Sequence, residues 1–114
     1  MEKTDVLEAL AALAQETRLD IFRLLVEAGP EGLAVGRIGE ALALPSATLS
    51  FHLKQLRFAG LATMRRDGRS LIYSADFSAM NGLLAYLTQN CCGGAPAACG
   101  IDPQLAPRQR QTAP

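Results

Sequence analysis

The sequence contains neither an apolar run long enough to cross a bilayer nor the leader of an exported protein. Its amino terminus does not place basic residues before an apolar segment, as a signal peptide does. No charged residue occurs from Phe77 to Ile101, but asparagine, glutamine, glycine and proline interrupt this stretch. The longest apolar run within it, Leu83 to Leu87, is far shorter than the roughly 20 residues of a transmembrane helix. We therefore expect a cytoplasmic protein with no membrane partner.

Histidine and cysteine are also scarce, which argues against a catalytic or disulfide-based interpretation. Histidine occurs once, at His52, and cysteine occurs at Cys91, Cys92 and Cys99. An odd number of cysteines in a chain without an export signal is unlike a disulfide framework, so we expect reduced thiols. A cysteine nucleophile needs a nearby base, yet His52 precedes Cys91 by 39 residues. Since the sequence also lacks a phosphate loop and a carboxylate pair, we expect no enzymatic activity.

Length and composition fit one domain followed by a tail. The 114 residues are 49% hydrophobic, which is enough apolar material for a single ordinary core. Residues 100–114 are rich in proline, glutamine and alanine and have little to bury. We expect a folded domain over residues 1–92 and a flexible tail over residues 93–114 that carries Cys99.

Hydrophobic periodicity predicts five helices. The first is expected to follow Thr4 as N-cap, and the second to begin with a capping box formed by Thr17 and Asp20 and to stop at Gly29-Pro30. The third, fourth and fifth are expected at residues 35–42, 46–59 and 77–90. Leu44-Pro45 forces a turn between the third and fourth, because proline disfavours helix in the residue before it. Two helices joined by such a turn are typical of a helix-turn-helix.

Beyond Leu61 the pattern changes from helix to hairpin. Residues 62–66 and 69–74 flank Asp67-Gly68, which is a strong signal for a two-residue hairpin turn. A two-stranded wing after a helix-turn-helix makes the expected fold class mainly α with a small β-hairpin, a winged helix-turn-helix.

The net charge of zero hides an asymmetry along the chain. Residues 1–36 carry a net charge of −4, and residues 37–75 carry +4. The basic segment includes the fourth helix and the wing. Because a phosphate backbone selects such a segment, double-stranded DNA is the expected partner.

The fourth helix presents a small, polar face opposite an apolar stripe of Leu49, Leu53 and Leu56. Four residues lie opposite the stripe and three lie on its flanks: Ala47, Ser50, Phe51 and Lys54, then Ser46, Thr48 and Arg57. Small residues and hydroxyls near a helix N-terminus permit close approach in the major groove. The alternative is an ordinary solvated surface. His52 lies beside the stripe, and it either bonds to the backbone at the edge of the core or donates to DNA.

The expected wing carries three arginines. In a two-residue hairpin with Asp67-Gly68 at the turn, Arg66 and Arg69 lie directly opposite each other, which costs some tenths of a kcal/mol. The fold gains nothing from this pair, so contact with phosphate is the better explanation. Arg65 points to the other face, where phosphate contact and plain solvation are equally good interpretations.

Three segments together resemble the ArsR/SmtB family of regulators. They are AALAQETRLDIFRLL at residues 11–25, LPSATLSFHLKQLRFAGL at 44–61 and RRDGRSLIY at 65–73. The resemblance covers about residues 5–92 and identifies the fourth helix as the recognition helix. It implies a homodimeric repressor in which the first and last helices form the dimer interface. A two-fold dimer would bind an inverted-repeat operator.

The cysteines suggest a sensing site at the end of the fifth helix. Cys91 follows Leu87 by four residues on the same helical stripe, Cys92 is its neighbour, and Cys99 returns after a loop. Three thiolates without imidazole or carboxylate favour a soft metal or metalloid. We expect As(III) or Sb(III) to draw the three sulfurs together, shift the fifth helices and release the operator. Thiol-redox sensing and another soft ion remain alternatives.

The sequence departs from two better-known sensing sites of the ArsR/SmtB family. The segment Leu33-Ala34-Val35-Gly36 resembles the family's third-helix cysteine motif, but alanine and glycine stand where cysteines would be. Zinc sensors of the family place aspartate and histidine on the last helix, and the one histidine here lies in the recognition helix. Similar regulators with an adjacent cysteine pair and a third cysteine at the end of the last helix respond to arsenic, and this variant fits the chain best.

Overall fold

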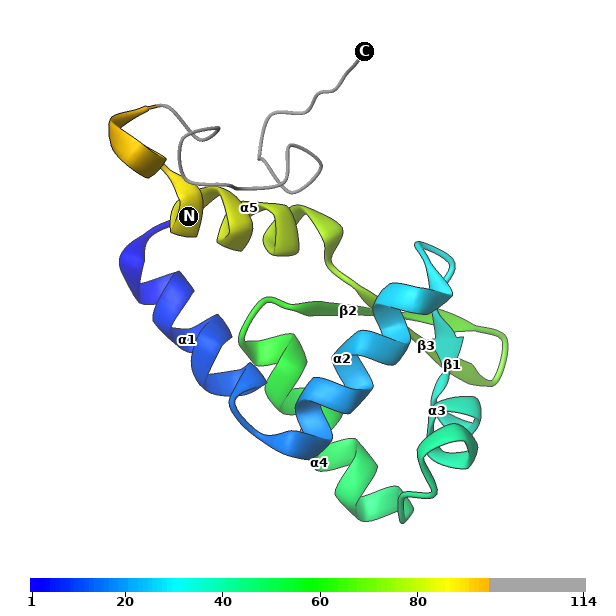
Figure 1. Ribbon diagram of the computed structural model, residues 1–114. Coiled ribbons are helices and arrows are strands. Elements are labelled where there is room, and N and C mark those ends of the chain that lie inside the picture. Colours follow the sequence, from blue (N-terminus) through cyan, green and yellow to red (C-terminus); the bar gives the residue numbers. More distant parts are fainter. Residues whose placement is uncertain (95–114) are drawn as a thin grey trace.

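The computed structural model describes residues 1–94 and contains five α-helices, three short strands and one turn of 3-10 helix within that range (Figure 1). In chain order the elements are α1 (Lys3–Leu13), α2 (Glu16–Ala28), β1 (Leu33–Ala34), α3 (Val35–Leu42), α4 (Ser46–Phe58), β2 (Ala62–Asp67), β3 (Ser70–Ala75), α5 (Phe77–Thr88) and η1 (Cys91–Gly93). This is the winged helix-turn-helix expected from the sequence. Nearly all of the expected tail, with Cys99, lies outside the described residues.

The first two helices begin earlier than predicted, because other residues cap them. Glu2 and Asp5 form a reciprocal capping box at the start of α1, so Thr4 lies inside the helix and is not its N-cap. The side chain of Gln15 accepts a hydrogen bond from the backbone N–H of Arg18 at the start of α2. Thr17 therefore lies within the first turn, and the capping box predicted for it does not form.

The sheet has three strands in the order β1-β3-β2, one more than predicted. The additional strand is β1, in which Leu33 pairs with Tyr73 and Ala34 with Ile72. Gly32 precedes it with φ of +75°, and a Cβ there would collide with the backbone carbonyl of Tyr73. Only glycine permits this close approach, which fixes the loop after α2 against the wing.

The hairpin turn lies one residue later than predicted. Asp67 pairs with Ser70, so the two turn residues are Gly68 and Arg69. Gly68 has φ of +63°, as the first central position of a type II′ turn requires. Arg66 consequently lies opposite Leu71, and the predicted pairing of Arg66 with Arg69 is wrong.

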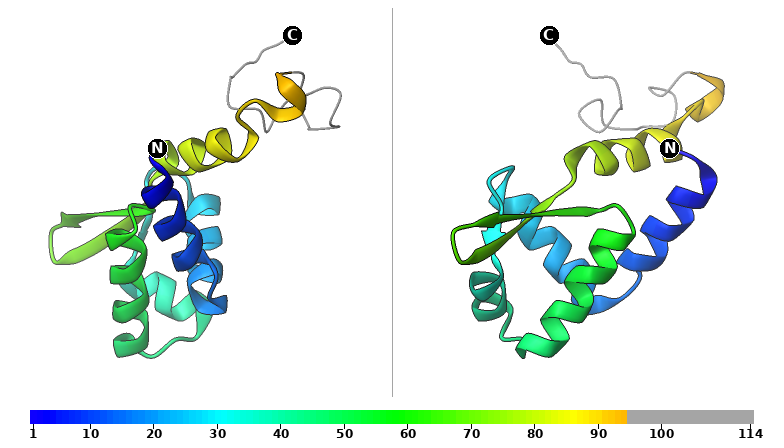
Figure 2. Two further views of the ribbon diagram at one scale, coloured as in Figure 1. Left: turned by 90° about the vertical axis from the view of Figure 1, so that its left-hand side faces the viewer. Right: turned by 180° about the vertical axis from the view of Figure 1, so that it is seen from behind.

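The core lies between the helices and one face of the sheet. Its largest fully buried side chains come from α2, α3, α4 and the start of the wing: Ile21, Leu25, Ile38, Leu49, Leu53, Leu56 and Leu61. The predicted stripe of α4 is thus buried. In the left-hand view of Figure 2, the β2–β3 hairpin projects from this body on one side and α5 extends toward the other. Within residues 1–94, no helix combines the length and apolar character needed to span a membrane.

Candidate DNA-binding surface and cysteine cluster

The face of α4 opposite the buried stripe is open to solvent. Six of the predicted contact residues on this helix are exposed: Ser46, Ala47, Thr48, Ser50, Phe51 and Lys54. Pro45 is the N-cap and has no side-chain oxygen, so the first backbone N–H groups of α4 have no side-chain cap. The positive end of the helix and these donors are therefore available to a phosphate. Arg57 is half-buried, and its guanidinium carbon lies 5.7 Å from the ring centroid of Phe58.

His52 lies at the edge of the core and interacts with a residue from another helix. Its Nδ1 is 3.2 Å from Nη1 of Arg18 in α2. A guanidinium only donates, so Nδ1 is the acceptor and the ring proton is on Nε2. Burial, and then the positive charge of Arg18, lower the pKa of His52 below its usual 6.5. The structure thus favours a neutral histidine fixed by Arg18 over a protonated one.

Arg18 connects three helices, a role that the sequence did not reveal. Its Nε donates to the carbonyl of Ala12 at 2.7 Å, near the end of α1, while its Nη1 contacts His52 in α4. The two contacts span 6 and 34 residues along the chain. Arg18 occurs in the segment that resembles ArsR/SmtB regulators, and this resemblance was the one sequence signal that could have pointed to it. Its bonds hold α4 to the end of α1.

The wing arginines differ in their surroundings. Nη2 of Arg65 donates to the carbonyl of Glu31 at 3.0 Å, so this side chain holds the wing to the loop after α2. Arg66 lies on β2 and Arg69 in the turn, and both are exposed. The last two therefore present charge near the tip of the hairpin, which projects from the body on the side where α4 lies in the left-hand view of Figure 2.

Two cysteines lie just beyond α5, which ends two residues earlier than the predicted Asn90. The helix ends at Thr88, and the left-handed backbone at Asn90 and Cys92 turns the chain into η1. The sulfur of Cys91 donates to that of Cys92 at 3.8 Å. Cys92 takes part in a disulfide bond, which differs from the reduced state expected from the sequence. Cys99 lies outside the described residues, and residues 1–94 contain no group of three potential metal ligands.

Comparison with known proteins supports a regulator. A helix-turn-helix domain model matches residues 13–65. The chain is 30% identical over 83 residues to the HTH-type transcriptional regulator YgaV of Escherichia coli, covering 73% of this chain and 82% of YgaV. It is 45% identical over 60 residues to a putative arsenical resistance operon repressor, ArsR, of Halobacterium salinarum. This match covers 53% of this chain and 46% of that repressor. The chain belongs to the ArsR family. A third relative, the regulator YceK of Bacillus subtilis, is 44% identical over 59 residues. This match covers 52% of this chain and 58% of YceK.

Solved structures agree with this ArsR-family assignment. HlyU of Vibrio cholerae has a TM-score of 0.62 and 29% identity, covering 81% of this chain and 99% of its own. A second structure is the homodimeric winged helix-turn-helix DNA-binding domain of a possible ArsR-family regulator from Mycobacterium bovis. It has a TM-score of 0.60 and 27% identity, and the match covers 77% of this chain and 82% of that domain. The chain spans only about half the length of YceK and of the Halobacterium ArsR. These relatives are transcriptional regulators and not enzymes, in agreement with the sequence-based expectation.

Proposed function

We propose that this ArsR-family chain is a repressor that binds an inverted-repeat operator as a homodimer. The observation that carries the proposal is the exposed face of α4, together with the exposed Arg66 and Arg69 of the wing. An uncapped helix N-terminus, hydroxyls and arginines together match the needs of groove entry and phosphate contact. A gel shift with random duplex should show weak binding that declines as salt rises. Absence of binding to random duplex and to the chain's own promoter DNA, even in dilute buffer, would contradict the proposal.

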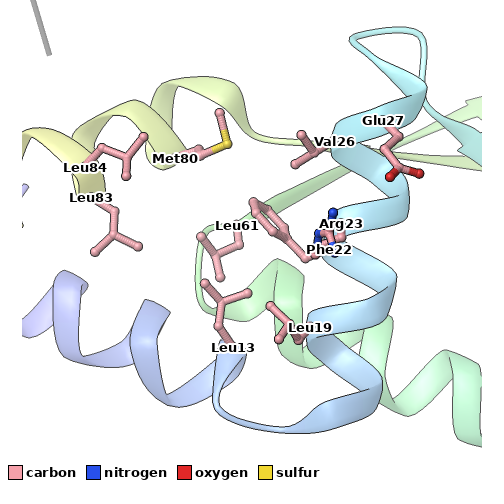
Figure 3. Close-up of a pocket in the computed structure, with 10 residues that line it drawn as sticks. All are labelled: Leu13, Leu19, Phe22, Arg23, Val26, Glu27, Leu61, Met80, Leu83 and Leu84. Carbon is pink, nitrogen blue, oxygen red and sulfur yellow. The ribbon is translucent and has the colours of Figure 1, made fainter. Parts of the chain in front are cut away.

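The proposed dimer uses α1 and α5. Large apolar side chains on these helices are exposed, with Leu7 at 59% and Leu87 at 57%. Beside them, a groove of about 350 Å³ separates α5 from α2 and the end of α1 (Figure 3). Its lining is almost wholly apolar and includes Leu13, Phe22 and Leu84. Apolar surface of this extent on two neighbouring helices is typical of a subunit interface, and the Mycobacterium bovis domain is homodimeric.

Sedimentation equilibrium tests this interface. The wild-type chain of 12.1 kDa should sediment as a dimer. Leu87→Glu should shift it toward monomer, because a charge replaces exposed apolar surface at the proposed contact. Met64→Glu is the matched control, since Met64 is an exposed apolar residue of the wing. A monomeric wild type, or a dimer equally weakened by both substitutions, would contradict the assignment.

We further propose that Cys91, Cys92 and Cys99 bind As(III) or Sb(III) as thiolates. Two sulfurs that bind one ion through bonds of about 2.3 Å lie no more than about 4.6 Å apart, and the 3.8 Å between Cys91 and Cys92 meets that limit. An all-thiolate donor set favours soft ions, and the Halobacterium relative is named for arsenical resistance. Since ligand binding alters DNA affinity only if it favours one conformation, linking Cys99 to the end of α5 supplies the required coupling.

X-ray absorption at the arsenic edge tests the ligand set. The reduced protein with arsenite should show three sulfurs around arsenic. Cys91→Ser, Cys92→Ser and Cys99→Ser should each reduce the sulfur number and weaken the response of DNA binding to arsenite. Two sulfurs around arsenic in the wild type would replace the proposal with a two-thiol site. An absence of sulfur around arsenic would rule out a thiolate site.

A thiol-redox switch is the second candidate, because Cys92 takes part in a disulfide bond. In that case oxidation alone would change operator affinity, and a thiol reductant would reverse the change. Binding isotherms in reductant and in oxidant, both with a metal chelator, separate the candidates. Equal affinities in the two buffers would exclude the redox switch.

A further inference from the structure

One residue on the candidate DNA-binding surface has chemistry that its neighbours do not share. Phe51 is 56% exposed at the centre of the open face of α4, one turn from Ala47 and beside Ser50 and Lys54. Hydroxyls and an ammonium group have donors or acceptors to offer to base edges and phosphates, but a phenyl ring has neither. A single exposed aromatic is ordinary on a protein surface, but at the centre of a face proposed to enter the major groove its ring would meet base edges directly.

The ring of Phe51 is also held in place. It contacts the ring of His52 edge to face, with centroids 5.2 Å apart and planes at 67°. His52 accepts from Arg18, and Arg18 in turn donates to the carbonyl of Ala12. This chain of contacts runs from the backbone of α1 to the surface of α4. The contact with His52 favours one orientation of the Phe51 ring before any partner binds, and binding has only two side-chain torsions to immobilise.

The major groove offers one apolar group for such a ring. Among the base edges exposed there, the 5-methyl group of thymine is the apolar feature, while the other groups are hydrogen-bond donors and acceptors. We propose that Phe51 is a specificity-determining residue that selects a thymine methyl at one position of each half-site. The proposal rests on the DNA binding proposed above. It assigns the hydrogen-bonding part of recognition to neighbouring residues and the methyl group to Phe51.

Replacing thymine by uracil tests this inference, because uracil lacks only the methyl group. A duplex is first selected with the wild-type protein from a randomised library, and each thymine is then replaced in turn. At one symmetric pair of positions the substitution should weaken binding about fourfold per half-site and about fifteenfold for both, the value of one buried methyl-sized group. At the same positions, 5-methylcytosine should bind more tightly than cytosine.

Variants of α4 assign the effect to its residue. Phe51→Ala should bind the thymine and uracil duplexes equally. Phe58→Ala is the matched control, since Phe58 is a 69% exposed phenylalanine at the end of the same helix and should retain the difference. A thymine preference that persists in Phe51→Ala, or a wild type indifferent to uracil everywhere, would overturn the inference while leaving the repressor intact. If no duplex is selected at all, the proposed DNA binding fails and the inference fails with it.

Discussion

At the scale of single residues, the contact of Arg18 with His52 joins the candidate DNA-binding surface to the rest of the fold. It joins residues 34 positions apart and has no periodic signature, so the sequence left the role of His52 open. The structure places His52 at the core edge with the side chain of Arg18, not the backbone, as its partner, and a contact of Nε2 with DNA stays a prediction. Because the guanidinium donates to Nδ1, the folded state favours neutral histidine, and the pKa of His52 is lowered by burial and by Arg18.

A pH dependence of stability follows from this shift. Below about pH 6.5 the unfolded chain binds a proton at His52 that the folded chain resists, so the free energy of unfolding should fall as pH decreases from 7 to 5. Well above pH 6.5, His52 is neutral in both the folded and the unfolded chain, so the free energy of unfolding no longer depends on this group. Urea denaturation at several pH values measures the slope. His52→Gln should remove the part of this slope that is due to His52. Identical slopes in the wild type and in His52→Gln would contradict the assignment.

Gly32 is a second residue whose role only the structure shows. Its positive φ and its closeness to the carbonyl of Tyr73 leave no room for a side chain. Gly32→Ala should lower the free energy of unfolding by roughly 1–3 kcal/mol. Gly36→Ala in α3 is the control, because nothing lies within 4 Å of its Cβ position and alanine favours helix by up to about 1 kcal/mol. Equal effects of the two substitutions in chemical denaturation would contradict this account.

At the scale of elements, the sequence was most informative where glycine and proline delimit a strong apolar pattern. Both α3 and α4 begin where they were predicted, with Pro45 between them, and Gly60 follows the end of α4. The predictions failed where several local signals competed. The hairpin turn moved by one residue, because glycine also suits the first central position. The strand β1 has two residues, too few for a visible alternation, and α5 ends before Asn90 because of a left-handed turn.

The end of α3 provides a prediction at this scale. Its C-cap, Ala43, is in the left-handed conformation with φ of +53°, which glycine adopts at lower cost. Ala43→Gly should raise the free energy of unfolding by about 0.5–1 kcal/mol. Ala41→Gly, at an exposed position inside the same helix, should lower it by a similar amount. Destabilisation by both, measured by thermal and urea denaturation, would show that the strain at Ala43 is negligible.

At the scale of the whole molecule, the exposed wing and the exposed face of α4 form the candidate DNA-binding surface, while α1 and α5 present the apolar one. The basic segment noted in the sequence contains both α4 and the wing, and DNA binding by this surface stays a prediction. The assignment of individual contacts to bases and phosphates depends on the complex, and the third cysteine lies outside the described residues.

The salt dependence of DNA binding tests the wing. Replacement of Arg66 and Arg69 by alanine should weaken binding and reduce the slope of log affinity against log salt by about 0.9 for each phosphate that an arginine no longer neutralises. The matched control is the double replacement by lysine, which retains both charges and should retain most of the slope. An unchanged slope in the alanine variant would place the wing away from the DNA backbone.

The most direct test of the central claim is a titration of arsenite into the complex of the reduced protein with its operator, followed by fluorescence anisotropy of labelled DNA. The account predicts that the complex dissociates as the thiols bind arsenic and that the variant with Cys91, Cys92 and Cys99 all replaced by serine stays bound. Persistence of the wild-type complex at saturating arsenite would contradict it.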